Sequence, residues 1–240
     1  MKRTALVTGA AHGLGAVAAR RLAAAAWDVV AVDVDELGLA KTAQRSPNTH
    51  VRVCDVTDPE ALAQVLAMTG PVHRVVHAAS AAPSGPVLAL PLGEMEDVLR
   101  RNVLGTVNVV QATLPGMLER SARSPERSAG GAEGSGSNPP SPGDMESRPP
   151  QGRAGEVFLC PDASGPPASP SAAAVAAYAD ALWAEHGGRG VALRCVHAAA
   201  GTPHGLVLDA MDRSLARPAR GVHVRVRPAR RPFPAALARR

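Results

Sequence analysis

A glycine-rich turn near the start of the chain limits its fold more than any other feature. Gly9, Gly13 and Gly15 follow an apolar run at residues 4–7 and introduce an alanine-rich stretch at residues 14–26. A strand-to-helix turn needs backbone angles that glycine adopts easily, and glycine lets the main chain approach a bound pyrophosphate. The helix that follows directs free N–H groups and the positive end of its dipole at such an anion. The pattern predicts a phosphate cradle, with a plain tight turn as the alternative.

A second strand with an acid at its end favours the phosphate cradle. Residues 28–32 are mostly apolar and lead into Asp33. In a dinucleotide-binding βαβ unit, a carboxylate about 20 residues beyond the glycines hydrogen-bonds the ribose. The distance between Gly15 and Asp33 in the sequence is close to that value. These residues predict a strand, a helix and a parallel strand around a nucleotide.

The run Thr-Gly-Ala-Ala-His-Gly-Leu-Gly at residues 8–15 resembles the cofactor motif of the short-chain dehydrogenase/reductase family. The resemblance implies a doubly wound, mainly parallel α/β sheet, Rossmann-like and in a single domain. It also implies a nicotinamide dinucleotide as the cofactor. The cofactor-binding residues that it implies are Gly9, His12, Gly13, Leu14, Gly15, Asp33, Asp55, Val56 and Ala79.

Two residues of this implied set favour NAD over NADP. In the family, an acid at the end of the second strand implies NAD, because a carboxylate repels a 2′-phosphate. Asp33 has that place, and His12 stands where members that prefer NADP often carry a cation. Because an ordinary imidazole is mostly neutral at pH 7, His12 favours NAD as well. We therefore expect NAD to be preferred.

Two further stretches match the family to different degrees. Asp55 matches an acid that contacts adenine in the family, and either Thr57 or Asp58 is a candidate cap for a helix over residues 59–68. Where the family usually carries Asn-Asn-Ala-Gly, this chain reads His-Ala-Ala-Ser from His77 and retains only Ala79. No second ligand lies at a suitable spacing from His77, so we predict a hydrogen-bonded strand residue there and no metal site.

One catalytic motif of the family is well matched. The run Arg-Asn-Val-Leu-Gly-Thr from Arg101 to Thr106 resembles the family's asparagine motif. In the family this asparagine distorts its helix, and its backbone carbonyl holds a water of the proton relay. The resemblance implies that role for Asn102, and an ordinary polar residue on a helix is the alternative.

The serine, tyrosine and lysine that complete the family's site are poorly matched. The mostly apolar run at residues 156–160 predicts the fifth strand, and counting from it puts other residues in their places, namely Asp162, Val175 and Ala179. A shifted register assigns Ser164 and Tyr178 but leaves Leu182 where the lysine belongs, and Lys2 and Lys41 are the only lysines in the chain. A tyrosine phenol that no lysine assists has a pKa of about 10. Leaving the pKa there rather than near neutrality makes loss of the phenol's proton at pH 7 less favourable by about 4 kcal/mol.

Two functions therefore stay open. The first is an NAD(P)-dependent oxidoreductase that transfers hydride between nicotinamide and a secondary alcohol or ketone, with Asn102, Ser164 and Tyr178 as catalytic residues. The second is a nucleotide-binding pseudoenzyme that keeps the cradle and has lost the tyrosine–lysine chemistry. In the second case Tyr178 is a packing residue.

Length and composition predict one domain with two unusual segments. A chain of 240 residues with 45% hydrophobic residues is long enough to bury a sizeable core. We predict an NAD-binding half at residues 1–120, a disordered Ser/Gly/Pro-rich insertion at 121–154, a degenerate catalytic half at 155–212, and an arginine-rich tail at 213–240. The insertion contains one large apolar residue, Met145, and cannot form a core.

The tail accounts for the positive charge of the chain. Residues 213–240 hold nine arginines and no acid, against a net charge of +5 for the whole chain. Clustered arginines can bind phosphate, but Phe233 is the only aromatic residue there for stacking on bases. We favour a solvated tail over a nucleic-acid contact. A shifted reading frame in GC-rich DNA would also give this composition.

One run within the tail has the pattern of a strand. In Gly-Val-His-Val-Arg-Val from Gly221, every second residue is valine, as alternation in a strand requires.

Cysteine usage and hydropathy bear on location and partners. Cys54, Cys160 and Cys195 are far apart and odd in number, which is typical of thiols in a reducing compartment. No stretch approaches the length of a membrane span, so we expect a cytoplasmic protein with no membrane contact. The expected partners are a small alcohol or ketone and, by resemblance to the family, further copies of the chain.

Overall fold

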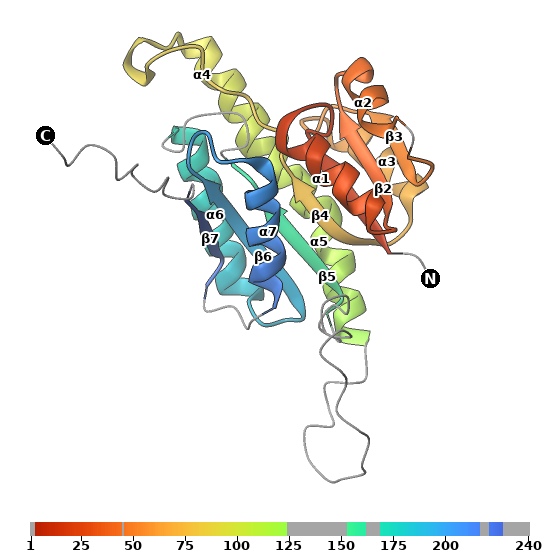
Figure 1. Cartoon of the computed structure of the whole chain (residues 1–240). Coiled ribbons are helices and arrows are strands. Elements are labelled where there is room, and N and C mark those ends of the chain that lie inside the picture. Colours follow the sequence, from red (N-terminus) through yellow and green to blue (C-terminus); the bar gives the residue numbers. More distant parts are fainter. Residues whose placement is uncertain (1–2, 45, 124–152, 162–168, 217–220, 228–240) are drawn as a thin grey trace, which may run out of the picture.

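Seven parallel strands form one sheet in the computed structural model of this chain, which describes residues 3–44, 46–123, 153–161, 169–216 and 221–227. The strand order is β3-β2-β1-β4-β5-β6-β7, with helices on both faces (Figure 1). The strands are β1 (Thr4–Thr8), β2 (Asp28–Asp33), β3 (Thr49–Val53), β4 (Val72–His77), β5 (Gly155–Leu159), β6 (Val191–Ala198) and β7 (His223–Val226). The predicted doubly wound α/β fold is confirmed.

Helices connect successive strands, as parallel pairing requires. The α-helices are α1 (Gly13–Ala24), α2 (Glu36–Ala43), α3 (Pro59–Thr69), α4 (Leu92–Leu99), α5 (Gly105–Arg123), α6 (Pro170–His186) and α7 (His204–Leu215). A short 3₁₀ turn, η1 (Val87–Ala89), precedes α4, and a π-helical turn, η2 (Arg100–Leu104), joins α4 to α5.

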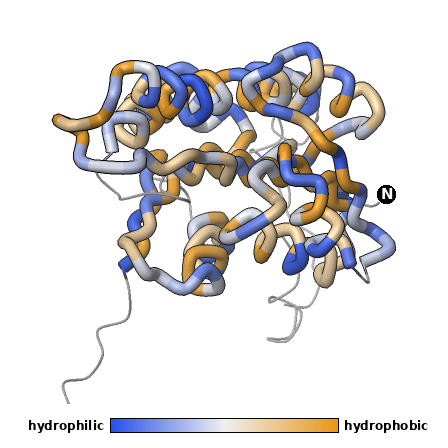
Figure 2. The backbone as a smooth tube through the Cα atoms, turned by 90° about the horizontal axis from the view of Figure 1, so that it is seen from above, coloured by the Kyte–Doolittle hydropathy of each residue, from blue (hydrophilic) through white to orange (hydrophobic). Residues whose placement is uncertain are grey.

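The core consists of two apolar layers, one on each face of the sheet. Helices α1, α2 and α7 contribute to one layer, and α3, α5 and α6 contribute to the other. The strands between them are mostly apolar, as in a sheet that is buried on both faces. Figure 2 shows hydrophobic segments through the middle of the molecule and more hydrophilic ones on the outer helices.

Local sequence signals explain where several helices begin. The carboxylate of Asp58 accepts hydrogen bonds from the backbone N–H groups of Glu60 and Ala61, at 2.9 and 3.0 Å, and Pro59 occupies the first turn. Asp58, one of the two candidates in the sequence, therefore caps α3. The hydroxyl of Ser169 caps α6 in the same way.

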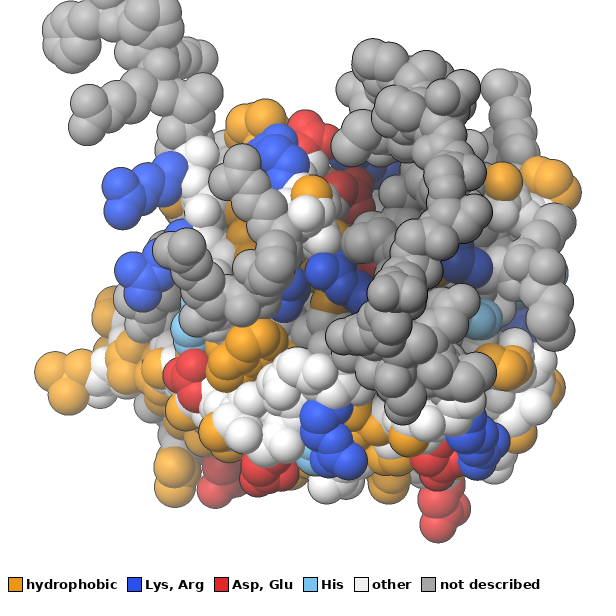
Figure 3. All heavy atoms as spheres, turned by 90° about the horizontal axis from the view of Figure 1, so that it is seen from below, with side chains coloured by type: hydrophobic (Ala, Val, Ile, Leu, Met, Phe, Trp, Pro, Cys, Tyr) orange, Lys and Arg blue, Asp and Glu red, His pale blue; other side chains and the backbone are white. Residues whose placement is uncertain are grey.

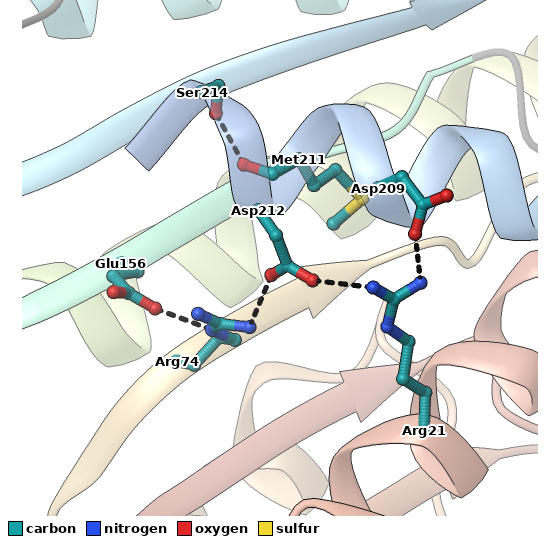
Figure 4. Close-up of polar contacts among 7 residues, drawn as sticks. All are labelled: Arg21, Arg74, Glu156, Asp209, Met211, Asp212 and Ser214. Atoms are coloured by element: carbon teal, nitrogen blue, oxygen red, sulfur yellow. Dashed lines mark hydrogen bonds and ion pairs between the residues drawn. The ribbon is translucent and has the colours of Figure 1, made fainter. Parts of the chain in front are cut away.

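A charged network joins elements from the two halves of the chain (Figure 4). The guanidinium of Arg74 on β4 binds Glu156 on β5 and also Asp212 on α7 at 3.1 Å. Arg21 on α1 binds Asp209 at 2.6 Å and Asp212 at 3.1 Å. Side chains of the first half therefore hold both β5 and α7 in place.

The predicted insertion and tail differ from expectation where they are described. Residues 121–123 complete α5, and residues 124–152 lie outside the described residues. Residues 213–215 complete α7, and β7 pairs with β6, so the expectation of a solvated tail is wrong for these residues. The alternation from Gly221 did predict a strand. Residues 228–240 lie outside the described residues.

Two further observations concern the surface charge and the helices of the described residues. On the face seen in Figure 3, basic side chains stand among acidic, hydrophobic and neutral ones over the part that is described. Within the described ranges, we find no helix with the length and apolar character that crossing a membrane requires.

Candidate cofactor site

The glycine-rich turn has backbone contacts that exclude side chains. Gly9 has a φ of +66° and Gly13 a φ of +51°, in the left-handed region that favours glycine. A Cβ on Gly9 would lie 2.6 Å from the Ala78 carbonyl, and a Cβ on Gly15 would lie 2.1 Å from the Gly9 carbonyl oxygen. The turn therefore packs directly on the end of β4 and on the first turn of α1.

A cavity of about 410 Å³ lies beside this turn, where β1, β2 and β4 end. The strand order reverses between β1 and β4, and open parallel sheets bind ligands at such a point. The volume is within the range of roughly 300–1,000 Å³ that is typical of small-molecule sites. All predicted cofactor residues except Gly15 line it, namely Gly9, His12, Gly13, Leu14, Asp33, Asp55, Val56 and Ala79.

Two carboxylates are fixed on the wall of the cavity by backbone amides. One oxygen of Asp33 accepts a hydrogen bond of 3.0 Å from the Ala11 N–H, and the other accepts one of 2.8 Å from the Val34 N–H. Asp55 accepts a bond of 2.8 Å from the Thr57 N–H. The Asp33 bonds tie the glycine-rich turn to β2 and hold the carboxylate at the cavity wall.

Cationic groups also border the cavity. Arg100 and Arg101, in the π-helical turn, line it. Sequence reasoning missed both, although Arg101 is the first residue of the matched motif and Arg100 directly precedes it. His12 lies with its Nε2 atom 3.1 Å from Asp35 Oδ2, at the start of α1.

The residues present fit a dinucleotide. The closely packed glycine backbone at the N-terminus of α1 is suited to a pyrophosphate. Ser80 is one of the residues that line the cavity, and its hydroxyl is buried without a hydrogen-bond partner among the described residues. A buried polar group without a partner costs free energy, and a polar ligand atom would supply the missing bond.

Asn102 lies within the π-helical turn, where the sequence resemblance implied a distorted helix. Its side-chain oxygen accepts a bond of 2.6 Å from the Ala81 N–H, and its Nδ2 donates one of 2.9 Å to the Ala81 carbonyl. The same Nδ2 donates to Ser171 Oγ at 2.9 Å. Asn102 thus joins the segment after β4 to the start of α6. Ser171 was missed because no motif in the sequence marks it.

A buried chain of polar groups leads from the glycine-rich turn to Asn102. His77 Nδ1 lies 2.7 Å from Thr8 Oγ1, and Nε2 lies 3.0 Å from Thr106 Oγ1. Thr106 donates its hydroxyl to the Asn102 carbonyl at 2.5 Å, so it accepts from Nε2–H, and Thr8 donates to Nδ1. Burial lowers the pKa of His77 to about 4, so the ring is neutral at pH 7. The prediction of a hydrogen-bonded strand residue is confirmed.

The predicted proton donor lies away from this site. Tyr178 packs, half-buried, against the core layer that α6 covers, and it is not among the described residues that line the cavity. Burial, followed by the carboxylate of Glu185, raises the pKa of Tyr178, whereas proton transfer needs a lowered one. Val175 and Ala179, the alternative register, are buried on α6. Ser164 lies outside the described residues.

Residues 3–124 match the family model described as short chain dehydrogenase. The chain belongs to the short-chain dehydrogenase family. The match covers the glycine-rich turn, Asp33 and Asn102, and it ends at residue 124, one residue beyond the end of α5.

Curated relatives match about half of the chain. Sulfoacetaldehyde reductase 2 from Chromohalobacter salexigens is 31% identical over 130 residues, which are 51% of this chain and 52% of that protein. L-xylulose reductase from Mesocricetus auratus is 32% identical over 120 residues, 50% of this chain and 49% of that protein. The chain spans about half the length of the curated relatives it matches.

The whole fold has a solved counterpart. The crystal structure of a metagenomic short-chain oxidoreductase in complex with NADP has a TM-score of 0.68 and covers 95% of this chain and 97% of that one. The two sequences are 18% identical, so this likeness shows the fold alone.

Proposed function

We propose that this short-chain dehydrogenase family member binds NAD in the cavity beside its glycine-rich turn. The observation that carries the proposal is the turn itself, where a Cβ on Gly9 or Gly15 would collide with backbone atoms. Such packing leaves the first amides of α1 open to an anion. Ser80, a residue that lines the cavity and whose buried hydroxyl has no hydrogen-bond partner among the described residues, supports the same conclusion.

Most of the predicted residues, and the two arginines that were not predicted, have a place in this proposal. Gly9, Gly13 and the start of α1 would face the pyrophosphate, and Asp33 would accept hydrogen bonds from the adenosine ribose. Asp55 and Val56 would border the adenine, since they line the cavity beyond the end of β3. Arg100 and Arg101 add positive charge that complements a dinucleotide.

The preference for NAD over NADP depends on Asp33. Its carboxylate is held by the Ala11 and Val34 amides and lines the cavity. A 2′-phosphate at the ribose would meet this fixed negative charge at short range. A solved relative of 18% identity holds NADP, so we rest the preference on Asp33 and not on relatives.

Hydride transfer between NAD and a secondary alcohol or ketone is the second candidate, and the π-helical Asn102 favours it. A bound nicotinamide supplies or accepts the hydride. The chain must still move a proton, and the groups that it offers are Ser164 and Tyr178. Because burial raises the pKa of Tyr178 and no lysine follows Lys41, we propose that cofactor binding is retained and that turnover is weak.

The three cysteines, which lie far apart in the sequence, favour a reducing compartment such as the cytoplasm as the location of the protein.

The binding proposal is tested by titrating the purified chain with NADH and with NADPH, followed by nicotinamide fluorescence. We expect saturable binding with NADH tighter by at least about tenfold, which corresponds to ~1.4 kcal/mol. Asp33→Asn should remove most of this difference. Glu119→Gln, the same acid-to-amide change on an exposed side chain of α5, is the control. Absence of binding by either nucleotide contradicts the proposal.

Turnover is tested separately with a panel of secondary alcohols and ketones at saturating NAD or NADH. We expect rates close to the uncatalysed reaction and no difference between the wild type and Tyr178→Phe. A clear rate that Tyr178→Phe abolishes would contradict the pseudoenzyme proposal and would assign proton transfer to Tyr178.

A further inference from the structure

Three side chains that commonly bind metals lie together on the two last strands of the sheet. The register of β6 and β7 pairs Cys195 with His223. His197 lies two residues beyond Cys195, and alternate residues of a strand point to the same face. Cys195 packs in the core layer that α6 covers, so the three side chains share that face.

The donor atoms are close enough for one ion. The Cys195 sulfur and one ring nitrogen each of His197 and His223 lie within 4.8 Å of one another, and His197 Nε2 lies 3.0 Å from His223 Nδ1. In a tetrahedral site with bonds of about 2.0–2.3 Å, neighbouring donor atoms are about 3.3–3.8 Å apart. Small side-chain shifts would bring the three donors to these separations.

A carboxylate holds one imidazole in the form that binds metal. Asp180 Oδ1 on α6 lies 2.9 Å from His223 Nε2. A carboxylate accepts, so His223 carries its hydrogen on Nε2 and presents the Nδ1 lone pair toward His197 and Cys195. Metal-binding histidines commonly donate their second nitrogen to a carboxylate in this way.

Burial differs among the three residues in a way that suits ion entry. Cys195 is buried, His197 is intermediate and His223 is exposed, so solvent reaches the site from the side of β7. An ion there would have three protein donors and one position open to water. Thiolate and imidazole together suit Zn²⁺, whereas Mg²⁺ and Ca²⁺ prefer oxygen donors.

We propose that Cys195, His197 and His223 bind one Zn²⁺-class ion, with Asp180 orienting His223. On binding, the Cys195 thiol loses its proton to solvent and its sulfur bonds to the metal. Without the ion, His197 donates its Nε2–H to His223 Nδ1. On binding, His197 therefore releases that proton to solvent, takes up one from solvent on Nδ1, and coordinates through Nε2. The ion joins β7 to β6. This site is independent of the cofactor cavity, so it does not rest on the proposed function.

The test uses the full chain without an affinity tag, freed of metal by a chelator and titrated with Zn²⁺ by calorimetry. We expect one equivalent to bind, and Co²⁺ in its place to give a thiolate-to-cobalt charge-transfer band. Cys195→Ser should abolish the band, and His223→Asn should abolish binding of that equivalent. Asp180→Asn should weaken the affinity about 10–100-fold.

Two controls keep the outcome decisive. His50→Asn removes an exposed histidine from β3, the opposite edge of the described sheet, and Cys160→Ala removes a thiol from the other face. Both should bind Zn²⁺ as the wild type does. Because Cys195→Ser changes a core residue, the exposed His223 variant serves if the former does not fold.

Absence of a saturable equivalent would overturn the proposal. So would equal binding by the wild type and His223→Asn, or a cobalt complex without the thiolate band. The contacts would then be a hydrogen-bonded chain from His197 through His223 to Asp180 and nothing more.

Discussion

Asn102 Nδ2 lies 2.9 Å from Ser171 Oγ, and this bond connects the π-helical turn to the first turn of α6. Both side chains are buried, with 4% and 1% of their surface exposed. The bond therefore links the half of the chain that matches the family model to the half that does not.

We expect Asn102 and Ser171 to contribute to stability cooperatively. Ser171→Ala should lower the free energy of unfolding by about 1 kcal/mol, and Asn102→Ala by about 3 kcal/mol, because the latter also leaves the Ala81 backbone groups unpaired. Urea unfolding of the two single variants and the double variant gives the coupling energy, which we expect to be about 1 kcal/mol. Strictly additive effects would contradict the bond.

Replacing two helical glycines by alanine should have opposite effects on stability, because Gly15 packs against the glycine-rich turn and Gly116 does not. In Gly15→Ala the new Cβ meets the Gly9 carbonyl oxygen, so we expect lost NADH binding and a loss of stability of several kcal/mol, on the order of an overpacked core. In Gly116→Ala the new Cβ makes ordinary contact with Arg120, and the helix should gain about 0.5–1 kcal/mol. Thermal unfolding and NADH titration distinguish the two. Unchanged binding in Gly15→Ala would argue against the cradle.

His77 predicts a dependence of stability on pH. Its pKa is lowered by burial from 6.5 to about 4, so the unfolded chain takes up the proton first as the pH falls. Stability should therefore be complete above pH 6.5 and decrease between pH 6.5 and 4, by up to about 3 kcal/mol. His77→Asn removes this contribution.

Comparing the wild type with His77→Asn separates the contribution of His77 to the pH dependence of stability from that of other titrating groups. Burial, and then the charges of Arg120 and Arg3, also lower the pKa of His73, which acts in the same direction in both proteins. Urea unfolding of each protein from pH 7.5 to 4.5 gives the difference. Parallel pH profiles for the two proteins would mean that His77 is not buried as a neutral ring.

The ion pair between Arg74 and Glu156 predicts a large effect of removing one partner. The two side chains are 13% and 7% exposed, so Glu156→Ala leaves a largely buried guanidinium whose remaining carboxylate partner among the described residues is Asp212. We expect a loss at the lower end of about 3–5 kcal/mol. The double variant Arg74→Met with Glu156→Leu should be much closer to the wild type, as measured by chemical denaturation. Equal losses in both variants would contradict this account.

The sequence allowed most of the first half to be predicted, because its signals are local. Gly9 and Gly15 lie within one turn, Asp33 ends the next strand, and Asn102 lies in a six-residue motif. Each of these signals needs only a few neighbouring residues. The structure brings the predicted cofactor residues to one cavity, although their binding role stays a prediction.

The second half could not be predicted equally well, because its contacts join residues that are distant in the sequence. Glu156 is 82 positions from Arg74, and no local pattern predicts that they pair. The place of Tyr178 depends on where α6 begins, which Ser169 decides by capping the helix. The grouping of Cys195 with His223 depends on the register of two strands, and no motif in the sequence marks it.

Every described residue that lines the cofactor cavity lies between Gly9 and Arg101. A described residue beyond that stretch can affect the cavity only indirectly, through how α5, β5, α6 or α7 pack against the elements that line it. A descendant of this chain can therefore inherit the described lining of the proposed nucleotide site as one continuous block while the remainder diverges.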